Sequence, residues 1–390
     1  MSEVRVALAA LAVLMTCAPS PGQPPLVRDR CGFCCTAVPS TLRQEFASAR
    51  AVVFGTLANP SMNPAGDEKT AVTDLRVERV LKADPALNGL RVITLNRYVP
   101  VADPKKPPRY LIFFDVDKGR LEPYRGLLNE EAAVDYLQGA LKLDNKKPGD
   151  VLVYFHKHLA SPSKDIAGDA FRELQELSHE ALRQHAGRLS ADSIADRLRS
   201  EKTPAWTRSL EAILLGHCGT DRHAGLLAAR IEKGLESEDS AGMHGLLIGQ
   251  TLLKPSEGLA NLRKVATDRK SPFVLRYESL KALRYFLGVR KDVLKRDDLI
   301  RTMTVMLEQE DIADLIIEEF RRAREEKMVD RILDLRGKKE FDLPIIRRTT
   351  LRFCLTFPKN ARAADYVEEI RAADPAYVKD TEELLKLEQP

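Results

Sequence analysis

The side chains best suited to chemistry in this 390-residue chain are cysteines near its start. Cys31, Cys34 and Cys35 stand together in the segment CGFCC. Thiolates so close together can bind zinc or copper(I), whereas the thiols of an exported chain are expected to oxidise to disulfides. A tetrahedral zinc site usually needs a second spaced pair, and no cysteine occurs between Cys35 and Cys218. We therefore favour disulfides, with free thiols and a metal site as alternatives, and we expect no cofactor.

A second group of reactive side chains stands in the segment GHCGTDRH, which we expect to be a loop between two helices. His217, Cys218 and His223 could form a metal site or a Cys–His dyad. The favoured interpretation is structural, a tight glycine-framed turn in which His217 caps a helix end and Cys218 is buried. Nucleophilic-serine, phosphate-loop, dinucleotide-binding and His-Glu-x-x-His motifs are absent from the sequence, so we predict no catalytic residue and no enzyme.

The first residues have the pattern of a secretory signal. Arg5 precedes the apolar stretch Val6–Met15, which is too short to span a bilayer of roughly 20 apolar residues. We expect a signal peptide over 1–16 and a proline-rich tether over 17–30. The mature protein is therefore expected outside the cytoplasm, in the periplasm or cell envelope.

Cys17 raises the question of a lipid anchor. It ends the segment LMTC, which resembles the cleavage site of bacterial lipoproteins, where the cysteine after the cut is lipidated. Leucine at the first position fits that pattern, while threonine before the cysteine is larger than usual. Lipoprotein and freely released protein both remain open, and a lipid on Cys17 is the only membrane contact expected.

Charge is balanced along the whole chain. There are 61 Lys and Arg residues and 57 Asp and Glu residues, which gives a net charge of +4. Nucleic-acid binding normally needs basic residues clustered on one face, and here both signs alternate. We therefore expect no nucleic-acid partner.

The first folded part is predicted to be a small antiparallel barrel within residues 31–145. Apolar residues alternate with polar ones in about five segments between Ala51 and Gly126, which is typical of strands. Asp117-Lys118-Gly119 is a plausible hairpin turn between the last two. Short helices are expected on either side, the first capped by Ser40.

This part resembles the netrin-like domain, on the cysteine cluster followed by ASARAVVFGTL and LRVERVLK. The resemblance implies the OB-type barrel of tissue inhibitors of metalloproteinases. Those inhibitors place a cysteine at the mature N-terminus, whereas Cys31 lies about fourteen residues after the predicted cleavage point. The zinc-chelating N-terminus of those inhibitors is therefore not carried over to this chain, and the resemblance of the domain alone gives the alternative function, a regulator or inhibitor of an extracellular metalloprotease.

Residues 146–390 are predicted to be entirely helical, because their apolar residues recur with the helical period. Helices are expected to start near residues 162, 204, 238, 272, 310 and 344, a repeat of roughly 34 to 42 residues. Three helix starts carry a proline followed four residues later by an arginine expected to cover or pair with the next repeat, namely Pro204 with Arg208, Pro272 with Arg276 and Pro344 with Arg348.

The repeat resembles degenerate HEAT repeats, and the whole chain resembles exported HEAT-like proteins of environmental bacteria such as planctomycetes. The expected fold class is a multidomain β + α protein, a small antiparallel OB-type barrel followed by an all-α HEAT-like solenoid. Solenoids usually bind other proteins. We therefore expect an exported, non-enzymatic binding or scaffold protein with a protein partner in the envelope or extracellular space. Metal handling through Cys31, Cys34 and Cys35 is a further alternative.

Overall fold

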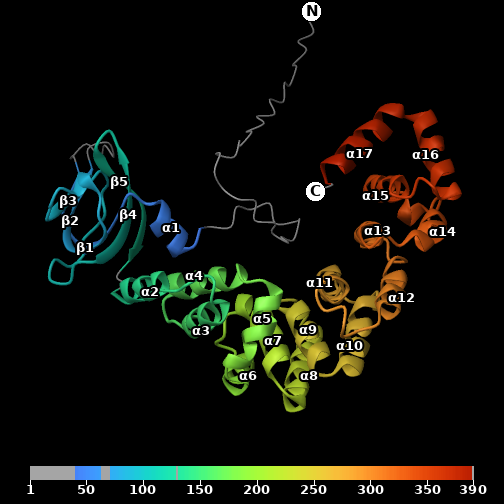
Figure 1. The fold of residues 1–390 in the computed structure, drawn as a ribbon, viewed down its shortest axis with the longest axis horizontal. Helices are drawn as coiled ribbons and strands as arrows, with labels where there is room; N and C mark the ends of the chain where they lie inside the picture. The colour runs from blue at the N-terminus through green and yellow to red at the C-terminus, as the bar shows by residue number, and fades with distance from the viewer. Residues whose placement is uncertain (1–39, 63–70, 129–130, 389–390) are drawn as a thin grey trace, which may run out of the picture. The chain divides into compact units, whose positions relative to one another are not determined.

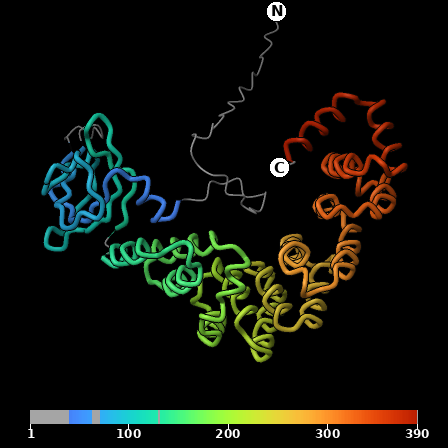
Figure 2. The backbone as a smooth tube through the Cα atoms, viewed as in Figure 1, coloured from blue at the N-terminus to red at the C-terminus, as the bar shows by residue number. Residues whose placement is uncertain are grey.

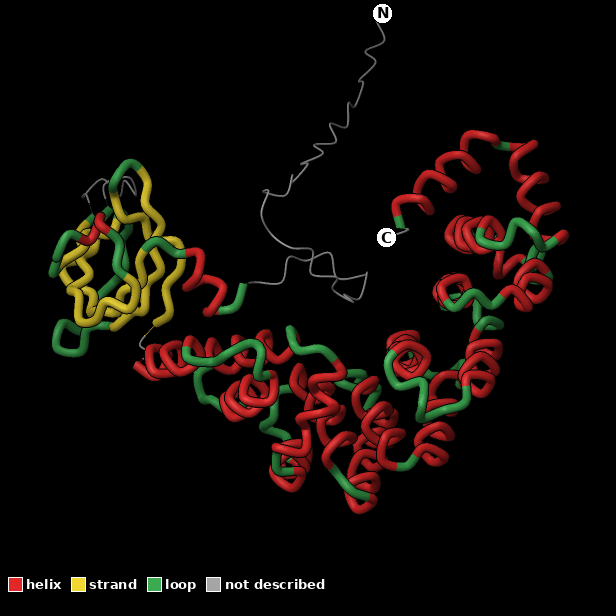
Figure 3. The backbone as a smooth tube through the Cα atoms, in the orientation of Figure 1, coloured by secondary structure: helices red, strands yellow, loops and turns green. Residues whose placement is uncertain are grey.

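The computed structural model describes residues 40–62, 71–128 and 131–388 (Figure 1). The predicted signal peptide and tether, the lipidation candidate Cys17 and the cluster Cys31, Cys34 and Cys35 lie outside the described residues. One short helix comes first along the described chain, the strands follow it, and a long helical region follows the strands (Figure 3). The expected sequence of a β part followed by an α part is confirmed.

The β part is one antiparallel sheet of five strands in the order β3-β2-β1-β4-β5. The strands are β1 (Ala51–Ser61), β2 (Val72–Lys82), β3 (Val92–Leu95), β4 (Arg109–Asp117) and β5 (Arg120–Leu128). Lys118 and Gly119 have φ values of 49° and 79°. Two successive residues with positive φ are typical of the turn that matches strand twist in a hairpin, so the hairpin predicted between β4 and β5 is present.

The sheet is open, which differs from the predicted closed barrel. Among the described residues no hydrogen-bonded ladder joins β3 to β5. The β3 strand is short, with four residues, and its hydrogen-bonded neighbour is β2. The two edges meet instead through side chains just after β3, where Arg97 donates to the carbonyl of Pro123 at 2.9 Å.

The sheet packs on both faces. On one face Val53, Leu75 and Ile112 belong to a core formed by the sheet alone. On the other face Phe54 and Phe113 belong to the core that continues through the helices. This double burial explains why the apolar residues of β1 and β4 run continuously in sequence rather than alternating.

Helix α1 (Leu42–Ser48) begins one residue later than expected. The predicted cap was Ser40, but the N-cap is Thr41. Its hydroxyl accepts a hydrogen bond from the backbone amide of Gln44, and the Gln44 side chain accepts one from the backbone amide of Thr41. This reciprocal pair is a capping box. The amide of Leu42 donates to the carboxylate of Asp169 at 2.8 Å, which fastens α1 to the helical region.

The helical region confirms the predicted change to helical spacing. Its α-helices are α2 (Glu131–Leu141), α3 (Pro148–His158), α4 (Lys164–Gln175), α5 (His179–His185), α6 (Ala191–Arg199), α7 (Arg208–Cys218), α8 (Asp221–Glu236), α9 (Met243–Leu253), α10 (Pro255–Thr267), α11 (Phe273–Gly288), α12 (Arg296–Met306), α13 (Ala313–Arg322), α14 (Val329–Leu333), α15 (Pro344–Leu355), α16 (Ala361–Ala373) and α17 (Pro375–Leu387). Short 3-10 helices stand at Pro85–Leu87, Ala186–Arg188, Ala205–Thr207, Glu326–Met328 and Lys339–Phe341. None of the helices in these ranges has the length and apolarity needed to cross a membrane.

Odd-numbered helices from α7 onward are neighbours in space. Helix α7 contacts α9, α9 contacts α11, α13 contacts α15 and α15 contacts α17. An ion pair between Arg284 and Glu319 (2.8 Å) connects α11 to α13. Figure 2 follows the chain through these helices in order of residue number. Helices one repeat apart in sequence therefore pack side by side, as repetition at this period predicts.

Candidate functional site

The loop within the segment GHCGTDRH is shorter than expected. His217 and Cys218 form the end of α7, and His223 lies in the first turn of α8, so only Gly219 and Thr220 separate the two helices. Within the described residues no group of three or more His, Cys, Asp or Glu side chains could hold a metal ion. The three candidate side chains have separate surroundings.

The described thiols are unreactive. Burial raises the pKa of Cys218 to about 11 and that of Cys354 to about 12. A cysteine acts as nucleophile or metal ligand through its thiolate, and these pKa values keep both residues as thiols near neutral pH.

His223 caps helix α8. Its Nδ1 accepts the backbone amide of Thr220 at 2.9 Å, and its Nε2 lies 3.3 Å from the carboxylate of Asp192 in α6. The ring is almost fully buried. One ring nitrogen caps α8 and the other connects α8 to α6, so His223 has a structural role.

His217 belongs to a cluster assembled from three helices. Its Nε2 lies 3.1 Å from the hydroxyl of Tyr285 in α11, and the ring of His179 in α5 packs edge-on against the same tyrosine at 5.2 Å. Burial, and then the positive charges of Arg290 and Arg183, lower the pKa of His217 to about 4. The imidazole is therefore neutral at physiological pH.

A hydrogen-bonded relay, Ser209–His244–Glu278, joins the starts of α7, α9 and α11. The Ser209 hydroxyl lies 2.6 Å from Nε2 of His244, and Nδ1 of His244 lies 2.5 Å from a carboxylate oxygen of Glu278. Burial acts to raise the pKa of Glu278, but the hydrogen bonds and charges of His244 and Lys281 outweigh it and hold that pKa at about 2.

The relay has the order of groups found in a nucleophile–base–carboxylate triad. Its serine, however, is packed against the backbone of α9. A Cβ placed on Gly245 would lie 2.5 Å from the Ser209 hydroxyl oxygen and 2.3 Å from the Ser209 carbonyl oxygen. We therefore interpret the relay as a link between three successive helices of the row.

An arginine four residues after a helix-initiating proline was expected to pair with the next repeat. This pairing is present at two of the three sites. Arg208 donates to Asp239 at 2.7 Å, and Arg276 donates to Asp311 at 2.8 Å. Each arginine thus reaches the loop before the next odd-numbered helix. Arg348 differs, because it is exposed and none of the ion pairs found among the described residues involves it.

Exposed apolar side chains gather at the beginnings of α7, α11 and α15. This apolar row is between 39% and 50% exposed and consists of Trp206, Phe273, Val274, Leu343 and Ile345. The ring of Phe273 stacks on Tyr277, and Trp206 packs edge-on against Phe171, so the aromatic members are held in place. Exposed apolar groups gathered near the starts of several helices are candidates for an interaction surface.

Sequence reasoning did not find the apolar row, although a signal was present. Each segment has an apolar residue beside the proline, in PAW, SPFV and LPII, ahead of the stripe that faces the core.

Comparisons with known proteins add no family to this description. The chain matches no protein-family model, no curated protein and no solved structure. Its function is therefore inferred from the geometry of its own residues.

Proposed function

We propose that this is an exported, non-enzymatic binding protein that recognises another protein through the apolar row. The row carries the proposal, because it presents a tryptophan, a phenylalanine and aliphatic side chains at the starts of α7, α11 and α15. Protein interfaces are enriched in aromatic residues, and a few ordered anchors supply most of their binding energy.

The arrangement of the helices supports a HEAT-like solenoid. Odd-numbered helices contact the next odd-numbered helix, and the joints Arg208–Asp239 and Arg276–Asp311 recur at corresponding positions. In a stacked repeat, equivalent positions form a continuous line. The apolar row takes its members from every second odd-numbered helix, and we propose that it contacts an extended segment of the partner.

The strand order supports an OB-type domain for the β part. In the order β3-β2-β1-β4-β5 the two edge strands would become neighbours if the sheet closed, and Arg97 already bridges them. The OB fold is a five-stranded, partly open barrel. The alternative functions, protease regulation and metal handling, depend on Cys31, Cys34 and Cys35, outside the described residues.

A matched pair of surface variants tests the proposal. The row variant carries Trp206→Ser, Phe273→Ser and Ile345→Ser, and the control carries Val289→Ser, Val305→Ser and Leu384→Ser, which are similarly exposed away from the row. Each purified protein is immobilised and incubated with cell-envelope extract, and retained proteins are quantified by mass spectrometry. Circular dichroism melting checks that all three proteins fold.

The expected result is one protein retained in stoichiometric amounts by the wild type and the control, and reduced at least tenfold by the row variant. Each buried anchor contributes about 2 kcal/mol or more to binding, so losing three abolishes retention. Equal retention by the row variant, or no retained protein, would contradict the proposal.

A further inference from the structure

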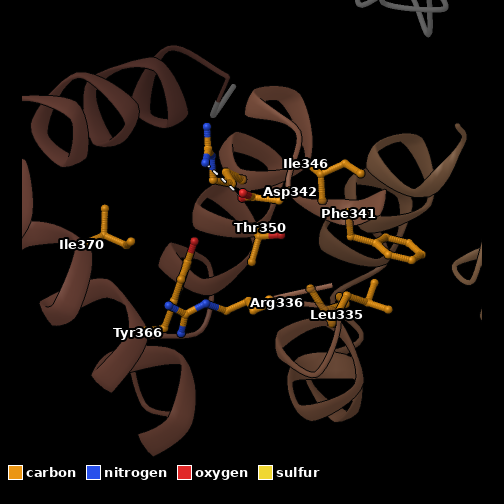
Figure 4. Close-up of a pocket in the computed structure, with 11 residues that line it drawn as sticks. Leu335, Arg336, Phe341, Asp342, Ile346, Thr350, Tyr366 and Ile370 are labelled. Carbon is orange, nitrogen blue, oxygen red and sulfur yellow. Dashed lines mark hydrogen bonds and ion pairs between the residues drawn. The ribbon is translucent and has the colours of Figure 1, made fainter. Parts of the chain in front are cut away.

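A pocket of about 180 Å³ lies between α14, α15 and α16 (Figure 4). Its apolar lining is formed by Ile332, Leu335, Phe341, Ile346 and Ile370. An apolar cavity of about 150 Å³ can hold benzene, so this pocket can take one aromatic ring or a branched aliphatic group.

Two nearly buried residues, Tyr366 and Thr350, line the pocket, and neither hydroxyl group has a hydrogen-bond partner among the described residues. Tyr366 is 5% exposed and Thr350 is 4% exposed. The neighbouring Thr349, in contrast, donates to carbonyls of its own helix at 3.1 Å. Figure 4 shows Thr350 in the middle of the pocket and the phenol oxygen of Tyr366 directed toward the side where Asp342 lies. The fully buried side-chain polar atoms without a partner in the described residues are Nε of Arg172 and Nε of Arg284, so the two hydroxyl oxygens here are not sealed off and can bond to a molecule that enters the pocket.

Arg336 gives one wall of the pocket a positive charge. It makes two parallel hydrogen bonds to Glu369, at 2.6 and 3.1 Å, and its guanidinium lies 4.5 Å from the centre of the Tyr366 ring. Burial raises the pKa of Tyr366 to about 12. The contact with Arg336 holds the tyrosine ring in place, and the raised pKa keeps its hydroxyl a neutral hydrogen-bond donor at physiological pH.

Arg347 adds a cation whose donors are mostly unused. Only one of its nitrogens bonds to Asp342, at 3.0 Å, and both side chains are more than half exposed. A guanidinium has five N–H donors in a planar fork that suits a carboxylate. Surface ion pairs of this kind are weak, so a second carboxylate can share the arginine.

We propose that this pocket binds a compact apolar group that carries a carboxylate. The apolar part lies on the isoleucine and phenylalanine side chains, and the carboxylate accepts hydrogen bonds from Tyr366, Thr350 and Arg347. Such a group is found in a free organic acid and at the C-terminal residue of a polypeptide. The proposal does not depend on the apolar row or on the proposed function.

Calorimetry and NMR titration on the full chain test the binding of 3-phenylpropionate against its neutral amide, 3-phenylpropanamide. The acid is expected to bind one site with a Kd of about 0.1–1 mM, an affinity typical of a ligand with so few non-hydrogen atoms. The amide is expected to bind at least tenfold more weakly. Absence of saturable binding, or equal affinity of acid and amide, would overturn the proposal.

Variants with matched neighbours locate the site. Thr350→Val and Tyr366→Phe are each expected to weaken binding about five- to tenfold, while Thr349→Val, next to the pocket residue, leaves it unchanged. Arg347→Gln is expected to weaken binding at least tenfold, while Arg348→Gln leaves it unchanged. Thr350 and Arg347 each have a control variant at the adjacent residue. Equal weakening of binding by a pocket variant and its adjacent control would argue against this site.

A second titration identifies the source of the carboxylate. The peptide N-acetyl-Gly-Gly-Phe and its C-terminal amide are compared with 3-phenylpropionate. Tighter binding of the peptide acid than of its amide assigns the pocket to a polypeptide C-terminus, and binding of the small acid alone assigns it to a free acid. If neither acid binds, the pocket is not a carboxylate site.

Discussion

His217 shows how the surroundings of one residue set its chemistry. The sequence places it beside Cys218 and close to His223, which suggests a shared site. In the fold its ring turns to Tyr285, 68 residues away, and lies near Arg183 and Arg290. The sequence was enough to identify His217 as a candidate site residue. Its partners could not be predicted, because they depend on how α5, α7 and α11 pack.

His217 should make stability depend on pH. Its pKa is about 4 in the folded protein and about 6.5 in the unfolded chain, so between these values the unfolded chain binds a proton that the folded protein does not. The free energy of unfolding therefore falls as pH falls from 6.5 to 4. In His217→Gln, which retains a hydrogen-bonding group for Tyr285, this part of the fall is expected to disappear. Urea unfolding at pH 7, 6, 5 and 4.5 measures both slopes, and identical slopes would show that His217 does not titrate as described.

The Ser209–His244–Glu278 relay was hidden in the sequence for a physical reason. Its members are 35 and 34 residues apart, which is one repeat each. Motifs within one helix bring together residues three or four apart, whereas this relay needs three helices to stack in register.

At the scale of helices, Gly245 sets how closely α9 approaches α7. Any side chain at this position would meet backbone atoms of Ser209, which cannot move aside. Gly225 in α8 offers a matched comparison, because it is exposed and a Cβ there has no neighbour within 4 Å.

Gly245→Ala is expected to lower the free energy of unfolding by about 1–3 kcal/mol through overpacking. Gly225→Ala is expected to raise it by about 0.5–1 kcal/mol, because alanine favours a helix over glycine. Chemical denaturation of both variants gives the comparison. Similar effects of the two changes would mean that α7 and α9 are not in the close contact described.

The strands and the helical region could be predicted because their periods differ. Apolar alternation located β2, and the Lys118-Gly119 turn located the β4–β5 hairpin. Closure of the sheet could not be predicted, since it depends on whether the short β3 strand reaches β5. The cap of α1 was misplaced by one residue because Ser40 and Thr41 are both good caps, and only Thr41 has Gln44 three residues later.

For the whole molecule, the junction between sheet and helices centres on Asp169. This carboxylate is fully buried and accepts the amide of Leu42 and the hydroxyl of Tyr136, each at 2.8 Å, while Arg172 lies 3.3 Å away. Burial raises its pKa despite these donors. Because the core passes from Phe54 and Phe113 into the helices, this junction joins two parts of one core.

Asp169→Ala is expected to lower the free energy of unfolding by about 3 kcal/mol, because the amide of Leu42 and the hydroxyl of Tyr136 would lose a charged acceptor. Hydrogen exchange in α1 should accelerate as a result. Asp165→Ala, an exposed position in the first turn of the same helix, should change stability by about 0.3–1 kcal/mol. Hydrogen exchange with mass spectrometry reports both effects, and unchanged protection of α1 in Asp169→Ala would count against the junction.

The two arginine joints bear on how such a chain can change its length over evolutionary time. Arg276 meets Asp311 as Arg208 meets Asp239, although the two joints lie in different parts of the helical region. A duplicated helix pair inserted between them would bring its own arginine and its own receiving aspartate. Gene duplication could therefore add or remove a whole helix pair without requiring a newly evolved contact at either end.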